Sequence, residues 1–113
     1  PASTPSPLAA YLAACFHVFT PRGGVTLRIG VAADPDFAAA GPWAIVSAAN
    51  PGSWPASPAA NEARHAELIA MARRLGCVWH PARNSADDGS WPEASVALRV
   101  SAAQADGLAC HYG

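Results

Sequence analysis

The segment between Ser57 and Gly76 constrains the fold more than any other part of the chain. Ser57 followed by Pro58 is typical of a helix N-cap and first helical residue, and Gly76 is typical of the position after a helix ends. Between them an apolar stripe recurs at the spacing of an amphipathic helix: Leu68, Met71, Ala72 and Leu75. The pattern predicts a helix over residues 58–75 that buries one face against other elements.

Short segments rich in apolar or β-branched residues predict strands around this helix. They are 15–20, 25–30, 43–48, 77–80 and 94–100. The first two segments flank residues 21–24, which carry the turn residues of a hairpin loop. Residues 81–92 are polar and are expected to form a loop.

Three smaller helices are predicted over 8–14, 34–40 and 101–112. Asp34 is expected to start the second helix, and the Ser-x-x-Gln pattern from Ser101 to Gln104 is a capping box that opens the third. The chain therefore contains helices and strands in an order that is typical of an α+β domain.

The strand at 43–48, the helix and the strand at 77–80 are predicted to form one right-handed βαβ crossover. We expect a single small α+β domain with a mixed, mostly antiparallel sheet of about five strands, that one crossover and a C-terminal helix. Residues 1–7 are rich in Pro and Ser, so we expect a disordered N-terminal tail. This leaves residues 8–113 for the domain.

Composition limits both the size of the core and the class of partner. Hydrophobic residues make up 51% of the 113 residues, but 28 residues are alanine, so the four Trp and three Phe must supply much of the buried area. The formal net charge is −1, which does not provide the positive surface typical of proteins that bind nucleic acid or anionic membranes. We expect neither of these partners; a small-molecule ligand, a protein partner or a homodimer remains.

The cysteines and histidines indicate the compartment and argue against a metal site. Cys15, Cys77 and Cys110 are widely spaced and match neither a metal motif nor a closed set of disulfides. We interpret them as buried reduced thiols of a cytoplasmic protein. No secretory signal or membrane-spanning segment is visible, although residue 1 is Pro, which leaves a removed leader as an alternative. No metal and no cofactor is expected.

Asn50 opens the first of three sequence patterns that suggest a functional site. The run Asn-Pro-Gly-Ser from Asn50 to Ser53 is typical of a type II turn and follows a predicted strand. Free backbone N–H groups between a strand end and a helix start favour anionic ligands. A plain turn without a ligand is the alternative reading.

Asn61 belongs to the second pattern, because it precedes Leu68 by seven residues and so falls on the buried stripe of the helix, with Arg64 following. An unsatisfied buried amide costs about 1–3 kcal/mol. Asn61 is therefore expected either to tie the helix start to the turn at 50–53 or to face a pocket beside that turn.

Trp91 and Glu93 form the third pattern, just before the last predicted strand. A carboxylate beside an indole can have a raised pKa, which is a property of general acids. The alternative is an exposed or salt-bridged Glu at the start of a strand.

Together these patterns resemble a bacterial family catalogued as domain of unknown function 3293. The matching motifs are S-A-A-N-P from Ser47, N-E-x-R from Asn61 and W-x-E-x-S from Trp91. The resemblance extends over about 8–112. Ala49 stands where members typically have Trp, and members usually continue after the final helix into a Gln-containing segment, whereas this sequence ends at Gly113. The family name assigns no activity, so the resemblance marks positions without giving them roles: Asn50, Pro51, Asn61, Trp91 and Glu93.

We expect a small bacterial, cytoplasmic binding domain without catalysis, whose site lies where the turn at 50–53, the start of the helix and the Trp91–Glu93 corner converge. The candidate ligand-binding residues are Asn50, Pro51, Asn61, Arg64, Trp91 and Glu93. The alternative is a hydrolase-like enzyme in which Glu93 is the general acid or base and Asn50 or Asn61 orients the substrate.

Overall fold

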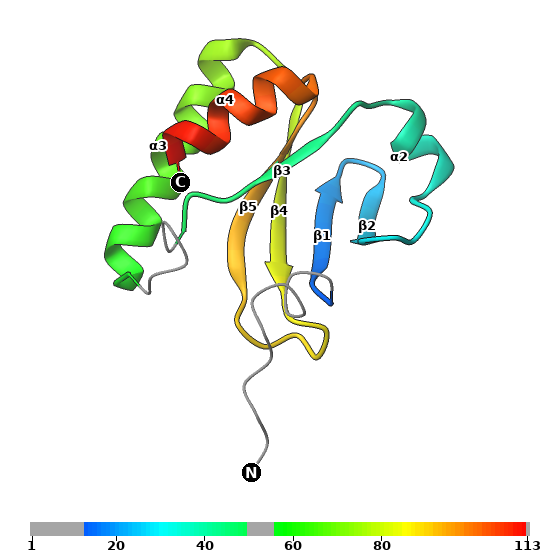
Figure 1. Ribbon diagram of the computed structural model, residues 1–113, viewed down its shortest axis with the longest axis horizontal. Coiled ribbons are helices and arrows are strands. Elements are labelled where there is room, and N and C mark those ends of the chain that lie inside the picture. Colours follow the sequence, from blue (N-terminus) through cyan, green and yellow to red (C-terminus); the bar gives the residue numbers. More distant parts are fainter. Residues whose placement is uncertain (1–12, 50–55, 113) are drawn as a thin grey trace.

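The strands of the protein form one five-stranded sheet, shown in Figure 1. The computed structural model describes residues 13–49 and 56–112, the last four of them as helix backbone only. The strands are β1 (Cys15–Thr20), β2 (Gly23–Arg28), β3 (Ala44–Val46), β4 (Trp79–Ser85) and β5 (Glu93–Leu98), and their order across the sheet is β2-β1-β4-β5-β3. The expected helix at 8–14 and the expected tail lie outside the described residues, apart from 13 and 14.

The helices are α2 (Pro35–Ala39), α3 (Pro58–Leu75) and α4 (Ala102–Tyr112). α3 is confirmed at both ends: the Oγ of Ser57 accepts a hydrogen bond from the N–H of Ala60 at 3.1 Å, and Gly76 follows the helix with a left-handed φ of 68°. The capping box of α4 is also confirmed. Ser101 Oγ accepts from the N–H of Gln104 at 3.2 Å, and Gln104 Oε1 accepts from the N–H of Ser101 at 2.9 Å.

The α+β class and the five strands are confirmed, but the sheet is not mixed. Each pair of neighbouring strands is antiparallel. β3 and β4 are both antiparallel to β5 and therefore run in the same direction, and α3 connects them. The expected crossover thus joins two strands that β5 separates, and it creates no parallel pair.

Four strands differ in their bounds from those predicted: β3 covers 44–46 instead of 43–48, β5 covers 93–98 instead of 94–100, and β4 and β2 differ more. β4 runs for seven residues, from Trp79 to Ser85, so it includes residues that were expected to lie in a loop. Pro81 lies just outside the ladder with β1, which begins at Ala82, so the proline is compatible with a strand here. In the hairpin, β2 begins at Gly23 instead of residue 25, which shortens the loop to Pro21 and Arg22.

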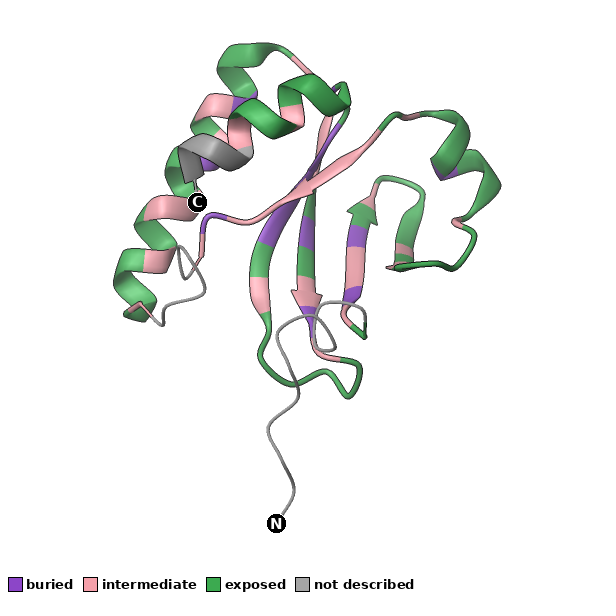
Figure 2. Ribbon diagram, in the orientation of Figure 1, coloured by how far each residue is buried: buried purple, intermediate pink, exposed green. Residues whose placement is uncertain are grey.

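The core lies on both faces of the sheet (Figure 2). α3 and α4 cover one face, where Leu68 and Ala72 of α3 pack with Val96 and Leu98 of β5. On the other face a second cluster consists of Val18, Phe37, Ala82 and Ala97. Because side chains alternate along a strand, β5 contributes to both clusters.

The apolar stripe of α3 is one turn shorter than predicted, since Leu75 is 51% exposed. Cys15 is a buried free thiol as expected, whereas Cys77 is a half-buried one, and the side chain of Cys110 lies outside the part that the structure describes. Within the part of the chain that the structure describes, no helix combines the length and hydropathy that crossing a bilayer requires.

Candidate functional site

Two hydrogen bonds connect the chain after β3 to α3 and to the start of β5. The Nε–H of Arg64 donates a hydrogen bond to the carbonyl oxygen of Ala48 at 2.7 Å, and the hydroxyl of Ser47 donates to the carbonyl oxygen of Ala94 at 3.1 Å. The chain that follows β3 therefore touches both α3 and the start of β5. Asn50 and Pro51 themselves lie outside the described residues.

Glu93 points away from the face that α3 covers. Val96 and Leu98 pack against α3, so strand alternation turns Glu93 toward the opposite face. There its Oε2 accepts a hydrogen bond from Nδ2 of Asn84, its cross-strand neighbour, at 3.4 Å. Asn61 is half-buried on α3, one turn before Arg64, and it has an interaction partner of its own.

Four of the six predicted residues, Asn61, Arg64, Trp91 and Glu93, lie in the described part of the chain, so whether all six meet at one place stays a prediction. Arg64 contacts the chain after β3, Glu93 contacts β4 on the other face, and Trp91 is 84% exposed. The hydrolase alternative needs the Glu93 carboxylate and the amide of Asn50 or Asn61 in one cavity, and it stays a prediction because Asn50 lies outside the described residues.

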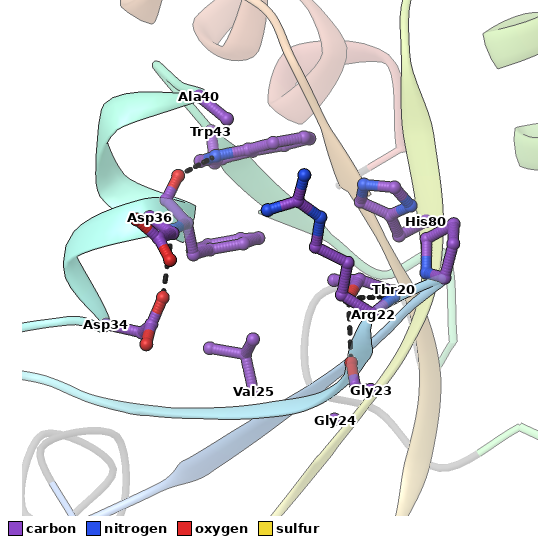
Figure 3. A pocket seen from close by; sticks show the side chains of 12 residues that line it. Thr20, Arg22, Gly23, Gly24, Val25, Asp34, Asp36, Ala40, Trp43 and His80 are labelled. Atoms are coloured by element: carbon purple, nitrogen blue, oxygen red, sulfur yellow. Dashed lines mark hydrogen bonds between the residues drawn. The ribbon is translucent and has the colours of Figure 1, made fainter.

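A cavity that the sequence analysis did not predict lies at the opposite end of the sheet, on the face away from α3. Its volume is about 570 Å³. The hairpin tip, α2, the residue before β3 and the start of β4 form its walls (Figure 3). The lining residues are Thr20, Pro21, Arg22, Gly23, Gly24, Val25, Asp34, Asp36, Phe37, Ala40, Trp43 and His80.

An aromatic wall on one side of this cavity is held in place by local contacts. The rings of Phe37 and Trp43 are stacked, with centroids 4.8 Å apart and planes 9° apart. The indole N–H of Trp43 donates a hydrogen bond to the carbonyl oxygen of Phe37 at 2.7 Å, which fixes the orientation of the ring. The imidazole of His80 lies 5.2 Å from the indole at a tilt of 38°. These contacts form a rigid apolar surface that does not need a ligand to order it.

Arg22 brings a positive charge to the cavity from the hairpin tip. The turn is stabilised by Thr20, whose Oγ1 accepts from the N–H of Arg22 at 3.2 Å and donates to the carbonyl oxygen of Gly23 at 2.7 Å. Figure 3 shows the Arg22 side chain reaching toward the indole of Trp43 and the imidazole of His80. Among residues 13–49 and 56–108, the Arg22 guanidinium has no hydrogen-bond acceptor and no ion-pair partner.

Two carboxylates lie on the α2 side of the cavity. Asp34 caps α2, where its Oδ1 accepts a hydrogen bond from the N–H of Phe37 at 3.0 Å. Asp36 is exposed in the first turn of the same helix. Across the described ranges, no three side chains of His, Cys, Asp or Glu gather in a way that could hold a metal ion.

This cavity could not be predicted from local sequence patterns, because its walls come from segments that lie far apart in the sequence. The hairpin loop, the cap at Asp34 and the strand near Trp43 each matched a structural pattern, and nothing local links them to His80. One feature of the sequence could have indicated the cavity: Trp43 directly follows Gly41 and Pro42, so a large ring is placed next to two turn-forming residues.

Comparison with known proteins identifies a family for this chain, but it finds no match among curated proteins or solved structures. A family model described as a protein of unknown function (DUF3293) matches residues 46–113. The matched range contains all six predicted site residues, but of the described residues that line the cavity it contains only His80.

Proposed function

Since the chain belongs to the DUF3293 family, whose function is unknown, we propose its function from the geometry: the protein binds a small molecule in the cavity beside Trp43. The observation that carries this proposal is the aromatic wall of Phe37 and Trp43 facing the guanidinium of Arg22, which has no partner among the described residues. Small-molecule sites have volumes of roughly 300–1,000 Å³ and combine apolar walls with a few polar groups. The cavity, at about 570 Å³, fits this description.

The groups around the cavity favour binding over catalysis. A nucleophile needs a general base within hydrogen-bond reach. The hydroxyl of Thr20 already donates to the backbone of Gly23, and the carboxylate of Asp34 already accepts from the backbone of Phe37. Both groups thus serve the local structure, so we propose a binding protein rather than an enzyme. The free thiols of Cys15 and Cys77 fit the bacterial cytoplasm that we propose as its location.

A fragment screen with a blocking variant tests this function. Ala40 lines the cavity and is exposed, so Ala40→Phe places a ring in the space that a ligand would fill. Ala39, the last residue of α2 and the neighbour of Ala40, is also exposed but is not among the lining residues, which makes Ala39→Phe the matched control. Fragments that bind the native state raise the unfolding temperature by mass action.

We expect fragment hits on the wild type and on Ala39→Phe, and loss of those hits on Ala40→Phe. If the hits bind all three proteins equally, they occupy another place and the proposed site is wrong. A diverse library without a single hit on the wild type would contradict the binding function itself.

Contact with a second copy of this chain is a second candidate function, and the predicted corner is its proposed surface. Trp91 is 84% exposed, and its backbone has a φ of 55°, which is rare for a bulky residue. Tryptophan is enriched in the residues that dominate protein interfaces. We expect the wild type to self-associate in analytical ultracentrifugation and Trp91→Ser to remain monomeric. A monomeric wild type over the whole accessible concentration range would remove this candidate.

A further inference from the structure

We propose that the cavity beside Trp43 selects a planar aromatic ligand with one carboxylate group. This inference rests on the proposed binding function and specifies the class of ligand. Three features of the cavity support it: the positive charge of Arg22, the ring surface of Trp43 and His80, and the two carboxylates on the α2 side.

The carboxylate of the ligand would pair with Arg22. A guanidinium presents a planar fork of N–H donors that matches the two oxygens of a carboxylate. In the described part of the chain no side chain uses this fork, although Asp34 and Asp36 line the same cavity. The hydrogen bonds of Thr20 hold the turn that carries Arg22, so its backbone is fixed before a ligand arrives.

The ring of the ligand would lie against the aromatic wall. The indole N–H of Trp43 is already donated to Phe37 and one face of the indole stacks on the Phe37 ring, so the indole offers an edge or its other face and not a hydrogen-bond donor. The imidazole of His80 is tilted by 38° to that face at a centroid distance of 5.2 Å. A flat ring can stack on this surface or meet it edge to face. The wall therefore favours an apolar aromatic body over a saturated or strongly polar one.

The two carboxylates of α2 would exclude a second negative charge. Asp34 and Asp36 line the α2 side of the cavity, and Arg22 reaches in from the hairpin tip. A ligand that extends from Arg22 toward α2 with a second carboxylate would bring like charges together in a partly desolvated space. A monocarboxylate should therefore bind better than a dicarboxylate of the same ring.

Binding of three ring compounds by isothermal titration calorimetry tests this inference. The probes are 2-naphthoate, its neutral amide 2-naphthamide and the dianion 2,6-naphthalenedicarboxylate. We expect 2-naphthoate to bind at least about tenfold more tightly than either of the others, because a hydrogen bond to a charged group typically contributes tenfold or more. Decahydro-2-naphthoate, which keeps the charge but is not aromatic, should also bind more weakly than 2-naphthoate.

Arg22→Gln should bind 2-naphthoate no better than 2-naphthamide. The matched control is Arg83→Gln, which removes the same charge from an exposed position on β4. By strand alternation Arg83 faces away from the cavity, since its neighbour Ala82 belongs to the cluster on the cavity side. This control should keep the preference for the carboxylate.

The outcomes separate the ligand class from the proposed function. If 2-naphthamide binds as tightly as 2-naphthoate and Ala40→Phe abolishes both, the cavity binds ligands but the carboxylate preference is wrong. If 2-naphthoate does not bind at millimolar concentration, the ligand class is wrong, and the fragment screen alone decides the binding function. If 2-naphthoate binds Ala40→Phe as well as the wild type, it occupies another place, the inference about the ligand class is overturned, and the fragment screen decides the binding function.

Discussion

Gly41 lies so close to Trp43 that a Cβ on Gly41 would stand 2.8 Å from Cδ1 of the indole. The same Cβ would lie 3.1 Å from the backbone nitrogen of Trp43 and 3.3 Å from the carbonyl oxygen of Ala38. The indole has little freedom to move, because it stacks on Phe37 and donates its N–H to the Phe37 carbonyl. A residue without a side chain at position 41 is therefore a condition for the aromatic wall of the cavity.

Gly41→Ala should destabilise the protein by about 1–3 kcal/mol, which is the usual range for added atoms that force neighbours to shift. Gly24→Ala is the matched control, since a Cβ there meets nothing within 4 Å. The control should change the free energy of unfolding by less than about 0.5 kcal/mol or raise it slightly. Urea unfolding followed by circular dichroism measures both. Equal stability of the two variants would show that the indole of Trp43 can move away from the added Cβ at little energetic cost.

Arg64→Met should destabilise the protein by about 1–3 kcal/mol. Methionine keeps the apolar stem but cannot donate to the carbonyl oxygen of Ala48, which belongs to a fully buried residue. Arg83→Met, at an exposed position on β4, should stay within about 0.5 kcal/mol of the wild type. Thermal unfolding measures the difference, which for a domain of this size corresponds to several degrees. No loss of stability in Arg64→Met would mean that α3 is held to the end of β3 by packing alone.

The helix ends could be predicted because their chemistry is local. Ser57 and Gly76 are sufficient to place α3, since the first supplies an acceptor for a free N–H and the second adopts a left-handed φ. Ser101 and Gln104 place the start of α4 in the same way. Each of these devices acts within a few residues, so neighbouring residues in the sequence carry all the necessary information.

The sheet order and the cavity depend on long-range contacts and could not be predicted. Nothing near β5 in the sequence indicates that it pairs with both β3 and β4. In β4 the buried residues are Ala82 and Ser85, so the strand lacks an apolar alternation that would distinguish it from a loop. Strand alternation predicts that the side chains of Glu93 and Val96 point to opposite faces of the sheet. Which of these faces α3 covers could not be predicted from the sequence.

Ser57→Ala should cost about 1 kcal/mol because the N–H of Ala60 loses its acceptor at the start of α3. Ser57→Asn, which keeps a side-chain oxygen suited to an N-cap, should retain most of the stability. Chemical denaturation of the three proteins gives the comparison. If Ser57→Ala and the wild type unfold at the same denaturant concentration, solvent replaces the cap at no cost.

Asp88 should show an acid titration that depends on Ser90. The hydroxyl of Ser90 donates to Oδ1 of Asp88 at 2.5 Å, its backbone N–H donates to the same oxygen at 2.9 Å, and these bonds hold the pKa of Asp88 below its ordinary value of 3.8. Because the pKa is lower in the folded state than in the unfolded state, ionised Asp88 stabilises the fold above about pH 4. This contribution disappears as the pH falls through the folded-state pKa.

Ser90→Ala removes the hydroxyl, which is the largest cause of the shift, and leaves the backbone N–H. The variant should therefore raise the pKa of Asp88 toward 3.8, as measured by NMR of its carboxyl carbon, and weaken the dependence of stability on pH below about 4. Ser101→Ala is the control: it removes a hydroxyl that caps α4 and should lower stability at every pH without moving the titration of Asp88. If the titration of Asp88 is the same in Ser90→Ala and the wild type, the hydroxyl does not carry the shift, and the backbone N–H of Ser90 accounts for it alone.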